Sequence, residues 1–119
     1  MILINNKHYN VFKTELKLSD LEIELFLLLI DKGMMTLEQI SSSLNLDTQT
    51  SNELIKSLIK KNMIIEYSVN LFETFHPRFA IINRYKTLCI DNNIVFKKNI
   101  LIDNLAIGLE KSFDAARTK

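Results

Sequence analysis

The chain contains few residues that break helices or cross-link a fold. Its 119 residues include only two glycines, one proline and one cysteine. Scarce glycine and proline leave little material for tight β-turns, so we expect helices to dominate. The single cysteine, Cys89, excludes an intramolecular disulfide and fits a reducing compartment. A chain of this length is expected to form one domain, and we expect an intracellular protein.

Long apolar runs and a strong charge imbalance are also missing. The longest unbroken apolar run extends only from Leu25 to Ile30, which is far too short to cross a bilayer. The first ten residues lack the basic and apolar regions of a secretory signal. Hydrophobic residues nevertheless make up 47% of the chain, which is ample for a core. The net charge is only +1, so the overall charge alone does not indicate nucleic-acid binding.

The charge is distributed unevenly along the chain. Residues 1–35 carry four basic and five acidic side chains, and residues 36–76 carry three basic and five acidic ones. Residues 77–119 carry eight basic and four acidic side chains, for a net charge of +4. The basic character therefore gathers in the last third of the chain.

The stretch "LSDLEIELFLLLIDKG" has the signals of one helix at both ends. Ser19 is a good N-cap residue, Glu22 stands three positions later as in a capping box, and Gly33 offers a left-handed stop. Between these residues, apolar side chains recur at helical spacing and cover most of the helix surface. We expect this helix to be nearly enclosed by protein.

Two shorter helices follow, separated by the turn "LNLD". Thr36 can cap the first of them and Asp47 the second. In the turn, Asn45 tolerates the left-handed conformation, and we expect Leu46 to plug the core. Asn62 stands where a helix often ends on glycine. The residues expected to face inward are Leu37, Ile40 and Leu44 of the first helix, and Ser51, Leu54, Ile55 and Leu58 of the second.

The flanking segments predict a small wing and further helices. "MIIEY" (63–67) and "LFETF" (71–75) predict two short strands around "SVN". Pro77 suits the first turn of another helix, and two helices are expected from there to the end, broken near 91–93. At the other end, "MILINNKHYNVF" (1–12) predicts either a small hairpin or an extended arm.

The last of these helices is expected to present a broad apolar face. A terminal amphipathic helix cannot bury both flanks against so small a domain, so we expect it to pack on a second copy of the chain. The apolar residues assigned to it are Phe96, Ile100, Leu105 or Ala106, Leu109 and Phe113, with Ile102 and Ile107 widening the face.

Three stretches carry a resemblance to a known family: "LSDLEIELFLLL", "TLEQISSSLNLD" and "LIKSLIKKNMI". Together with "FHPRFAI" after the wing, they resemble the N-terminal domain of the archaeal TrmB-like transcriptional regulators, and more loosely the MarR and ArsR groups. The resemblance implies a mainly α winged helix-turn-helix with a small β wing at 1–76. The resemblance covers residues 18–82, and from the amphipathic last helix we expect a C-terminal helical dimerisation segment at 77–119, within one compact unit.

The chain departs from the family pattern in three ways. Asn62 replaces the glycine that usually ends the leucine-rich helix, and the wing lacks the basic residue that commonly reaches the minor groove. The family's large effector-binding C-terminal domain is absent from this sequence, so we do not expect sugar sensing. The resemblance therefore implies an archaeal-type regulator reduced to its DNA-reading module and a dimer helix.

If the helix at 47–61 enters a major groove, its inner stripe fixes which residues face the DNA. Gln and Asn can pair bidentately with adenine, Thr can pack on a thymine methyl, and Lys can reach phosphate or guanine. Glu53 would repel phosphate but can accept a hydrogen bond from cytosine. The alternative is an ordinary solvated helix face in a winged helix that binds protein. The predicted DNA-binding residues are Thr48, Gln49, Asn52, Lys56, Lys60 and Arg78.

Several other polar residues have two readings. Lys60 and Lys61 can contact the DNA backbone or simply complement the helix dipole. His76 can lie over a phosphate or serve as a polar junction residue. Tyr67 and Phe72 on the wing are expected in the core rather than stacked on bases. Four further cations can form a non-specific clamp beside the duplex or the wet face of a dimer helix. They are Arg84, Lys86, Lys97 and Lys98.

No motif indicates catalysis, a metal or a cofactor. His8 and His76 are distant in sequence, Cys89 has no neighbouring histidine and reads as a small core residue, and no glycine-rich phosphate loop is present. We therefore expect no enzymatic activity. The first hypothesis is a cytoplasmic, nucleoid-associated homodimer that binds double-stranded DNA and regulates transcription. The alternatives are a winged-helix protein-interaction module and, as a weaker option, a small-molecule or redox sensor with a pocket between dimer helices.

Overall fold

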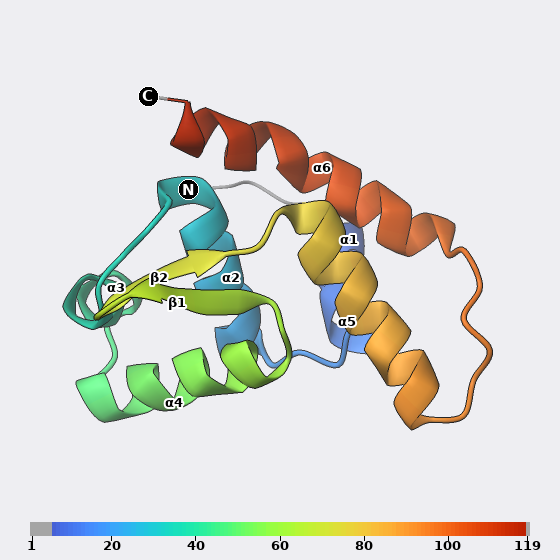
Figure 1. Cartoon of the computed structure of the whole chain (residues 1–119), viewed down its shortest axis with the longest axis horizontal. Helices are drawn as coiled ribbons and strands as arrows, with labels where there is room; N and C mark the ends of the chain where they lie inside the picture. Colours follow the sequence, from blue (N-terminus) through green and yellow to red (C-terminus); the bar gives the residue numbers. More distant parts are fainter. Residues whose placement is uncertain (1–5, 119) are drawn as a thin grey trace.

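The computed structural model describes residues 6–118 and contains six helices and one two-stranded sheet (Figure 1). The expected class, mainly α with a small β wing followed by C-terminal helices, is confirmed. In chain order the elements are α1 (Asn6–Thr14), α2 (Asp20–Lys32), α3 (Leu37–Leu44), α4 (Thr48–Lys60), β1 (Ile64–Ser68), β2 (Leu71–Thr74), α5 (Pro77–Asp91) and α6 (Ile100–Arg117).

The predicted ends of α2 are confirmed. The backbone amide of Glu22 donates to Ser19 Oγ at 3.2 Å, and the amide of Ser19 donates to Glu22 Oε1 at 2.9 Å, which closes a capping box. Gly33 ends the helix with φ 85°, a conformation that side chains with a Cβ rarely adopt. Its amide donates to the carbonyl of Leu29 at 2.9 Å.

The helix-turn-helix also has its predicted geometry. Asn45 adopts the left-handed conformation, with φ 56° and ψ 47°, and Asp47 Oδ1 accepts from the backbone amide of Thr50 at 2.7 Å. The expected position of Leu46 is wrong, because it is only half-buried and does not join the core of the described chain. On α4, the inward-facing stripe is confirmed. Ser51, Ile55 and Leu58 are at most 1% exposed, and Leu54 packs against the core half-buried.

The wing is short and attached to α3. β1 and β2 pair antiparallel, and Met35, in the segment before α3, forms a bridge with Phe72 on β2. At the wing tip, Asn70 Nδ2 donates to Glu38 Oε1 at 2.8 Å, while its Oδ1 accepts from the amide of Leu37 at 3.2 Å. The tip is therefore held against the start of α3.

α2 forms the centre of the core. It contacts α4 on one side and α6 on the other, and Figure 1 shows it running between them. The rings of Phe12 and Phe26 meet edge to face, with centroids 6.0 Å apart. Because α2 packs against one side of α4, that side of α4 is held in the core and its outer side is left uncovered.

The N-terminal prediction of a hairpin or extended arm is wrong where the structure describes it. Residues from Asn6 onward form α1, and residues 1–5 lie outside the described part of the chain. α1 packs on α2 and α6, with Val11 and Phe12 buried, and the Tyr9 hydroxyl donates to Asp20 at 2.7 Å. So short a helix depends on this tertiary packing, because nine residues alone are marginal in water.

The last helix differs from its prediction in extent and in packing. It begins at Ile100, so Phe96 lies in the connection from α5 and not in the helix. The expectation that its apolar face is left for a second copy is wrong for most of that face, because α6 crosses α2 and completes the core of its own subunit. The residues buried there are Ile102, Leu105, Ala106 and Leu109.

Arg117 fastens the end of α6 to two other elements. Its guanidinium donates to the carbonyls of Leu29 and Ile30 at the end of α2, at 3.0 and 2.8 Å. The same group pairs with Glu73 on β2 and lies 3.7 Å from the centre of the Phe113 ring. α6 is therefore an integral part of the winged-helix core.

Candidate nucleic-acid interface

The outer surface of α4 is the polar face that the predicted inner stripe leaves uncovered. Because the inner stripe is sealed, the remaining side chains are forced outward. Asn52 is half-buried and the others are exposed. We call this surface the reading face. It comprises Thr48, Gln49, Asn52, Glu53, Lys56 and Lys60.

The reading face combines amides with few charges. Gln49, Glu53, Lys56 and Lys60 follow one another at steps of four, three and four residues, so they form one stripe along the helix. Within the described residues, no ion pair or hydrogen bond engages the side chains of the two lysines. Amides at such positions can pair with adenine edges, and lysines can contact phosphate.

The two ends of α4 differ in charge. At the N-terminus, hydrogen bonds from the side chain and backbone of Thr50 hold the pKa of Asp47 below its ordinary value. Asp47 therefore stays ionised and offsets the positive end of the helix dipole, which makes this end a poor phosphate site. Lys56 and Lys60 lie towards the other end. Phosphate contacts are consequently favoured along the C-terminal half of the helix.

A buried carboxylate anchors that C-terminal half. Glu22 on α2 is 5% exposed and accepts from Ser57 Oγ at 2.6 Å, from Lys61 Nζ and from the Ser19 amide. Burial raises the pKa of Glu22, but the hydrogen bonds from Lys61, Ser19 and Ser57 outweigh it and lower the pKa overall. Glu22 therefore stays ionised, and Lys61 is held by the protein rather than left for DNA.

Lys17 is a cation near this end that the sequence reasoning missed. It is exposed, adopts a left-handed φ of 55°, and makes no ion pair within the described residues. It lies in the turn before α2, two residues before Ser19, which shares Glu22 with Ser57 of α4. In the sequence, the position of Lys17 just before the N-cap residue in "KLS" could have indicated an exposed cation at the start of a helix. Lys17 therefore precedes the segment that hydrogen bonds through Glu22 connect to the C-terminal half of α4.

The basic residues after the wing are not gathered beside α4. Arg84 is buried, with Nε donating to the carbonyl of Leu16 at 3.1 Å, so both of its expected surface roles, in a clamp or on a solvated helix face, are wrong. Arg78 pairs with Glu110 on α6. Lys86 lies 5.8 Å from the Phe96 ring. The basic side chains of α5 therefore contact groups other than α4.

Lys97 and Lys98 follow α5 in the connection to α6, and both are exposed. Lys98 lies 3.8 Å from Asp103, a weak surface pair. His76 caps α5, where its Nδ1 accepts from the amide of Arg78 at 3.2 Å.

The wing carries no cation in the described structure. Phe72 is buried as expected, but the expectation for Tyr67 is wrong, because it is 65% exposed. β1 bears the exposed Glu66, whose charge disfavours a nearby phosphate, whereas Glu73 on β2 is paired with Arg117. The reading face therefore has no basic support from the wing.

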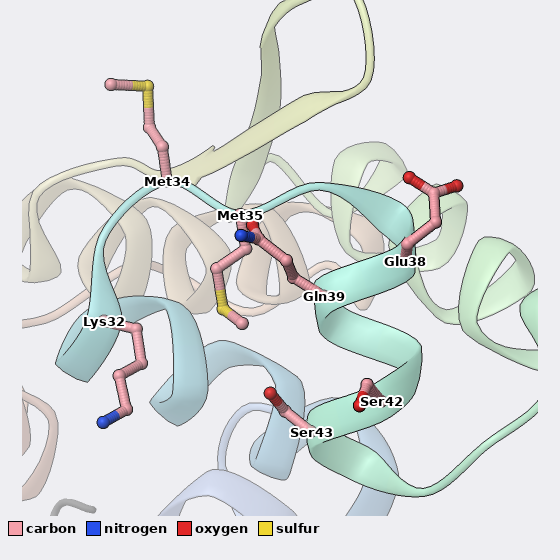
Figure 2. Close-up of a pocket in the computed structure, with 7 residues that line it drawn as sticks. All are labelled: Lys32, Met34, Met35, Glu38, Gln39, Ser42 and Ser43. Carbon is pink, nitrogen blue, oxygen red and sulfur yellow. The ribbon is translucent and has the colours of Figure 1, made fainter.

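A hollow lies beside α3 and is lined by none of these groups. It measures about 550 Å³ and is open (Figure 2). In Figure 2, Met35, Gln39 and Ser43 extend into the space between α2 and α3, whereas Met34 and Glu38 point away. Its polar groups belong mostly to one exposed helix face, and no cluster of three metal-ligating side chains exists within residues 6–118.

Cys89 is buried, as the core reading predicts. Among the described helices, none combines the length and apolarity needed to cross a membrane.

A comparison with protein families identifies the fold's relatives. The sequence model described as "Sugar-specific transcriptional regulator TrmB" matches residues 12–86. The chain belongs to the TrmB family. The match spans α2 to most of α5, including the wing and α4, so the resemblance inferred from the sequence is confirmed. This is a family of transcriptional regulators rather than of enzymes. No curated protein and no solved structure matches the chain.

Proposed function

We propose that this TrmB-family protein binds double-stranded DNA as a transcription regulator, with α4 in the major groove. The observation that carries the proposal is the division of α4 into a sealed inner stripe and an outer reading face with two amides and two unpaired lysines. Gln49 and Asn52 read adenine edges, and Lys56 and Lys60 contact phosphate or guanine. Arg78 is not part of this face, because its guanidinium pairs with Glu110.

Because the reading face carries few charges, we expect the DNA affinity to fall only modestly as the salt concentration rises. Three phosphate-contacting lysines per subunit, Lys17, Lys56 and Lys60, make six contacts in a dimer and give a slope of log affinity against log salt of about −5. Glu53 offsets part of this attraction. DNA recognition by this protein therefore relies on the amides of Gln49 and Asn52 more than on phosphate contacts, in contrast to strongly basic relatives.

We further propose that the protein acts as a homodimer through its C-terminal segment and is located with the nucleoid in the cytoplasm. One recognition helix with so few charges gives little affinity, whereas two linked helices bind cooperatively to paired half-sites. In a two-fold dimer the half-sites lie about one helical turn of DNA apart.

A selection experiment tests the proposal. Random-sequence duplexes are enriched on the wild-type protein at low salt, and the enriched sequence is titrated by gel shift at two salt concentrations. We expect an enriched motif and a salt slope near that stated above. Failure of the folded protein to retain any duplex at low salt contradicts the proposal.

The wing favours a second candidate, a protein-interaction module. Its tip exposes Val69 at 93% and Tyr67 at 65%, beside the acidic Glu66 and without a cation. Such a surface suits protein contact better than DNA contact. A triple alanine variant at Gln49, Asn52 and Lys56 distinguishes the two. Unchanged DNA affinity together with loss of a protein partner in pull-down favours this second function.

A further inference from the structure

Exposed apolar side chains concentrate at one end of the molecule. Within residues 6–118, ten large hydrophobic side chains are exposed, and seven of them lie on α5, on α6 or on the connection between these helices. A cluster of this kind marks an interaction surface more often than a chance arrangement does. We call it the connection face. It comprises Phe79, Ile90, Ile94, Val95, Phe96, Ile100 and Ile107.

The connection itself is unusual in composition. Residues 92–98 are all exposed and outside any helix or strand, yet they include three successive apolar residues. Ile94 is 60% exposed and Val95 is 76% exposed. Surface connections normally carry polar and turn-forming residues at such positions. Since these two side chains pack little within their own subunit, their apolar character is explained by a contact outside it.

The surface that carries these exposed apolar side chains also contains hollows. One, of about 340 Å³, lies between α5 and α6 and is lined by Ile82, Tyr85, Phe96 and Ile107 among others. A second of about the same volume lies along α5 and shares Ile82 with the first. A two-fold interface requires one patch that fits itself, with protrusions meeting hollows. The connection face offers both.

The charges around the connection face also suit a second copy. Lys86 and Lys97 are exposed on α5 and on the connection, and the acidic Asp91 is exposed at the end of α5, so the rim carries both signs. Two identical mixed rims can pair basic with acidic groups, whereas a membrane surface or an acidic partner favours a rim of one sign. Charge complementarity therefore favours self-association.

We propose that the connection face is the contact between two copies of this chain, with Ile94 and Val95 of each copy seated in the α5–α6 hollow of the other. This inference rests on the proposed function, which requires a dimer, and it places the interface on α5 and the connection rather than on the buried side of α6. In Figure 1 this surface lies at the opposite end of the molecule from the start of α4.

Sedimentation velocity across about 1 to 100 µM protein tests the interface. Val95→Glu is expected to weaken dimerisation at least about 100-fold, because it places a charge in an apolar hollow. Ile107→Glu, on the wall of the hollow, is expected to act likewise. Val69→Glu is the matched control, since Val69 is even more exposed but lies on the wing tip, and it should leave the dimer unchanged. Circular dichroism checks that each variant is folded.

Three outcomes overturn the inference: a wild-type chain that stays monomeric at the highest concentration, a Val95→Glu variant that dimerises like wild type, or equal weakening by Val69→Glu. DNA titration separates this failure from failure of the proposed function. A monomeric Val95→Glu variant should still bind a single half-site, whereas an α4 variant that loses DNA should still dimerise.

Discussion

The reading face and the connection face are both uncovered, but they are built in opposite ways. The reading face is polar, nearly balanced in charge, and carried by a helix whose other side is sealed into the core. The connection face is apolar, and three of its seven residues lie on a segment without regular structure. A rigid helix can hold hydrogen-bonding groups in a fixed pattern, which sequence recognition requires.

The contrast suggests that the reading face determines specificity and that the connection face contributes affinity. Polar groups with few charges discriminate between partners but contribute little net affinity. Apolar association supplies affinity and multiplies weak contacts by linking two copies. The variants that test this contrast are ordered by expected effect.

The largest effect is expected from reversing the lysines of the reading face. Lys56→Glu combined with Lys60→Glu should lower DNA affinity about 100-fold, because two attractive phosphate contacts become repulsive. Self-association should be unchanged, since neither residue lies on the connection face. Fluorescence anisotropy measures the first quantity and sedimentation the second. A variant that loses both properties together would show that the two faces are not separate.

Removing the anchor beneath α4 should have the next largest effect. Glu22→Gln leaves Lys61 without its carboxylate and should lower the free energy of unfolding by about 2–3 kcal/mol. At temperatures where the variant stays folded, DNA affinity should fall while dimerisation persists. Chemical denaturation gives the stability, and Glu24→Gln on the exposed side of α2 is the matched control.

The same carboxylate predicts how stability depends on pH. Because the folded protein lowers the pKa of Glu22 from its ordinary value of 4.5, the stabilisation is fully present above that value. It is lost as the pH falls through the lower folded pKa. Glu22→Gln should therefore show a smaller loss of stability than wild type in this acidic window. Equal acid sensitivity of the two proteins would contradict the role of Glu22.

Arg117 tests whether α6 belongs to its own subunit. Arg117→Lys retains the charge but cannot bond the end of α2 and β2 together, so stability should fall by about 2 kcal/mol. Hydrogen exchange should increase at Thr74, whose hydroxyl also accepts from this guanidinium. If stability is unaffected and only dimerisation weakens, α6 is a detachable dimer helix after all.

The smallest effect is expected from Glu53. Glu53→Gln removes the one carboxylate of the reading face and should raise DNA affinity about threefold at low salt, with less effect at high salt. Asp114→Asn makes the same change of charge at an exposed position on α6 and should have no comparable effect. Equal gains from both would mean that only net charge matters.

The local signals in the sequence predicted the helix-turn-helix well. Ser19, Thr36, Asn45 and Asp47 act at helix ends through neighbours within a few residues, so their roles can be read without knowing the fold. The inner stripe of α4 follows from helical periodicity in the same way. The outer face of that helix was consequently predictable, although nothing local states what binds to it.

The errors concern features that depend on contacts distant in sequence. α1 is too short for periodicity to distinguish it from an arm. Arg84 was assigned to the surface because it is charged, but the carbonyl of Leu16, 68 positions away, holds it inside. α6 was expected to need a partner, and only the fold shows that α2 covers it. Tyr67 is exposed because the short wing leaves its outer side uncovered.

The reading face is tested most directly by a matched pair of double variants on the DNA motif selected with the wild-type protein. Asn52→Ala with Lys56→Ala removes an amide and a lysine from α4, and Asn104→Ala with Lys111→Ala removes the same groups from the exposed side of α6. We predict loss of about 30-fold or more in affinity for the first variant and wild-type affinity for the second. Equal DNA affinity of the two folded variants would contradict recognition by α4.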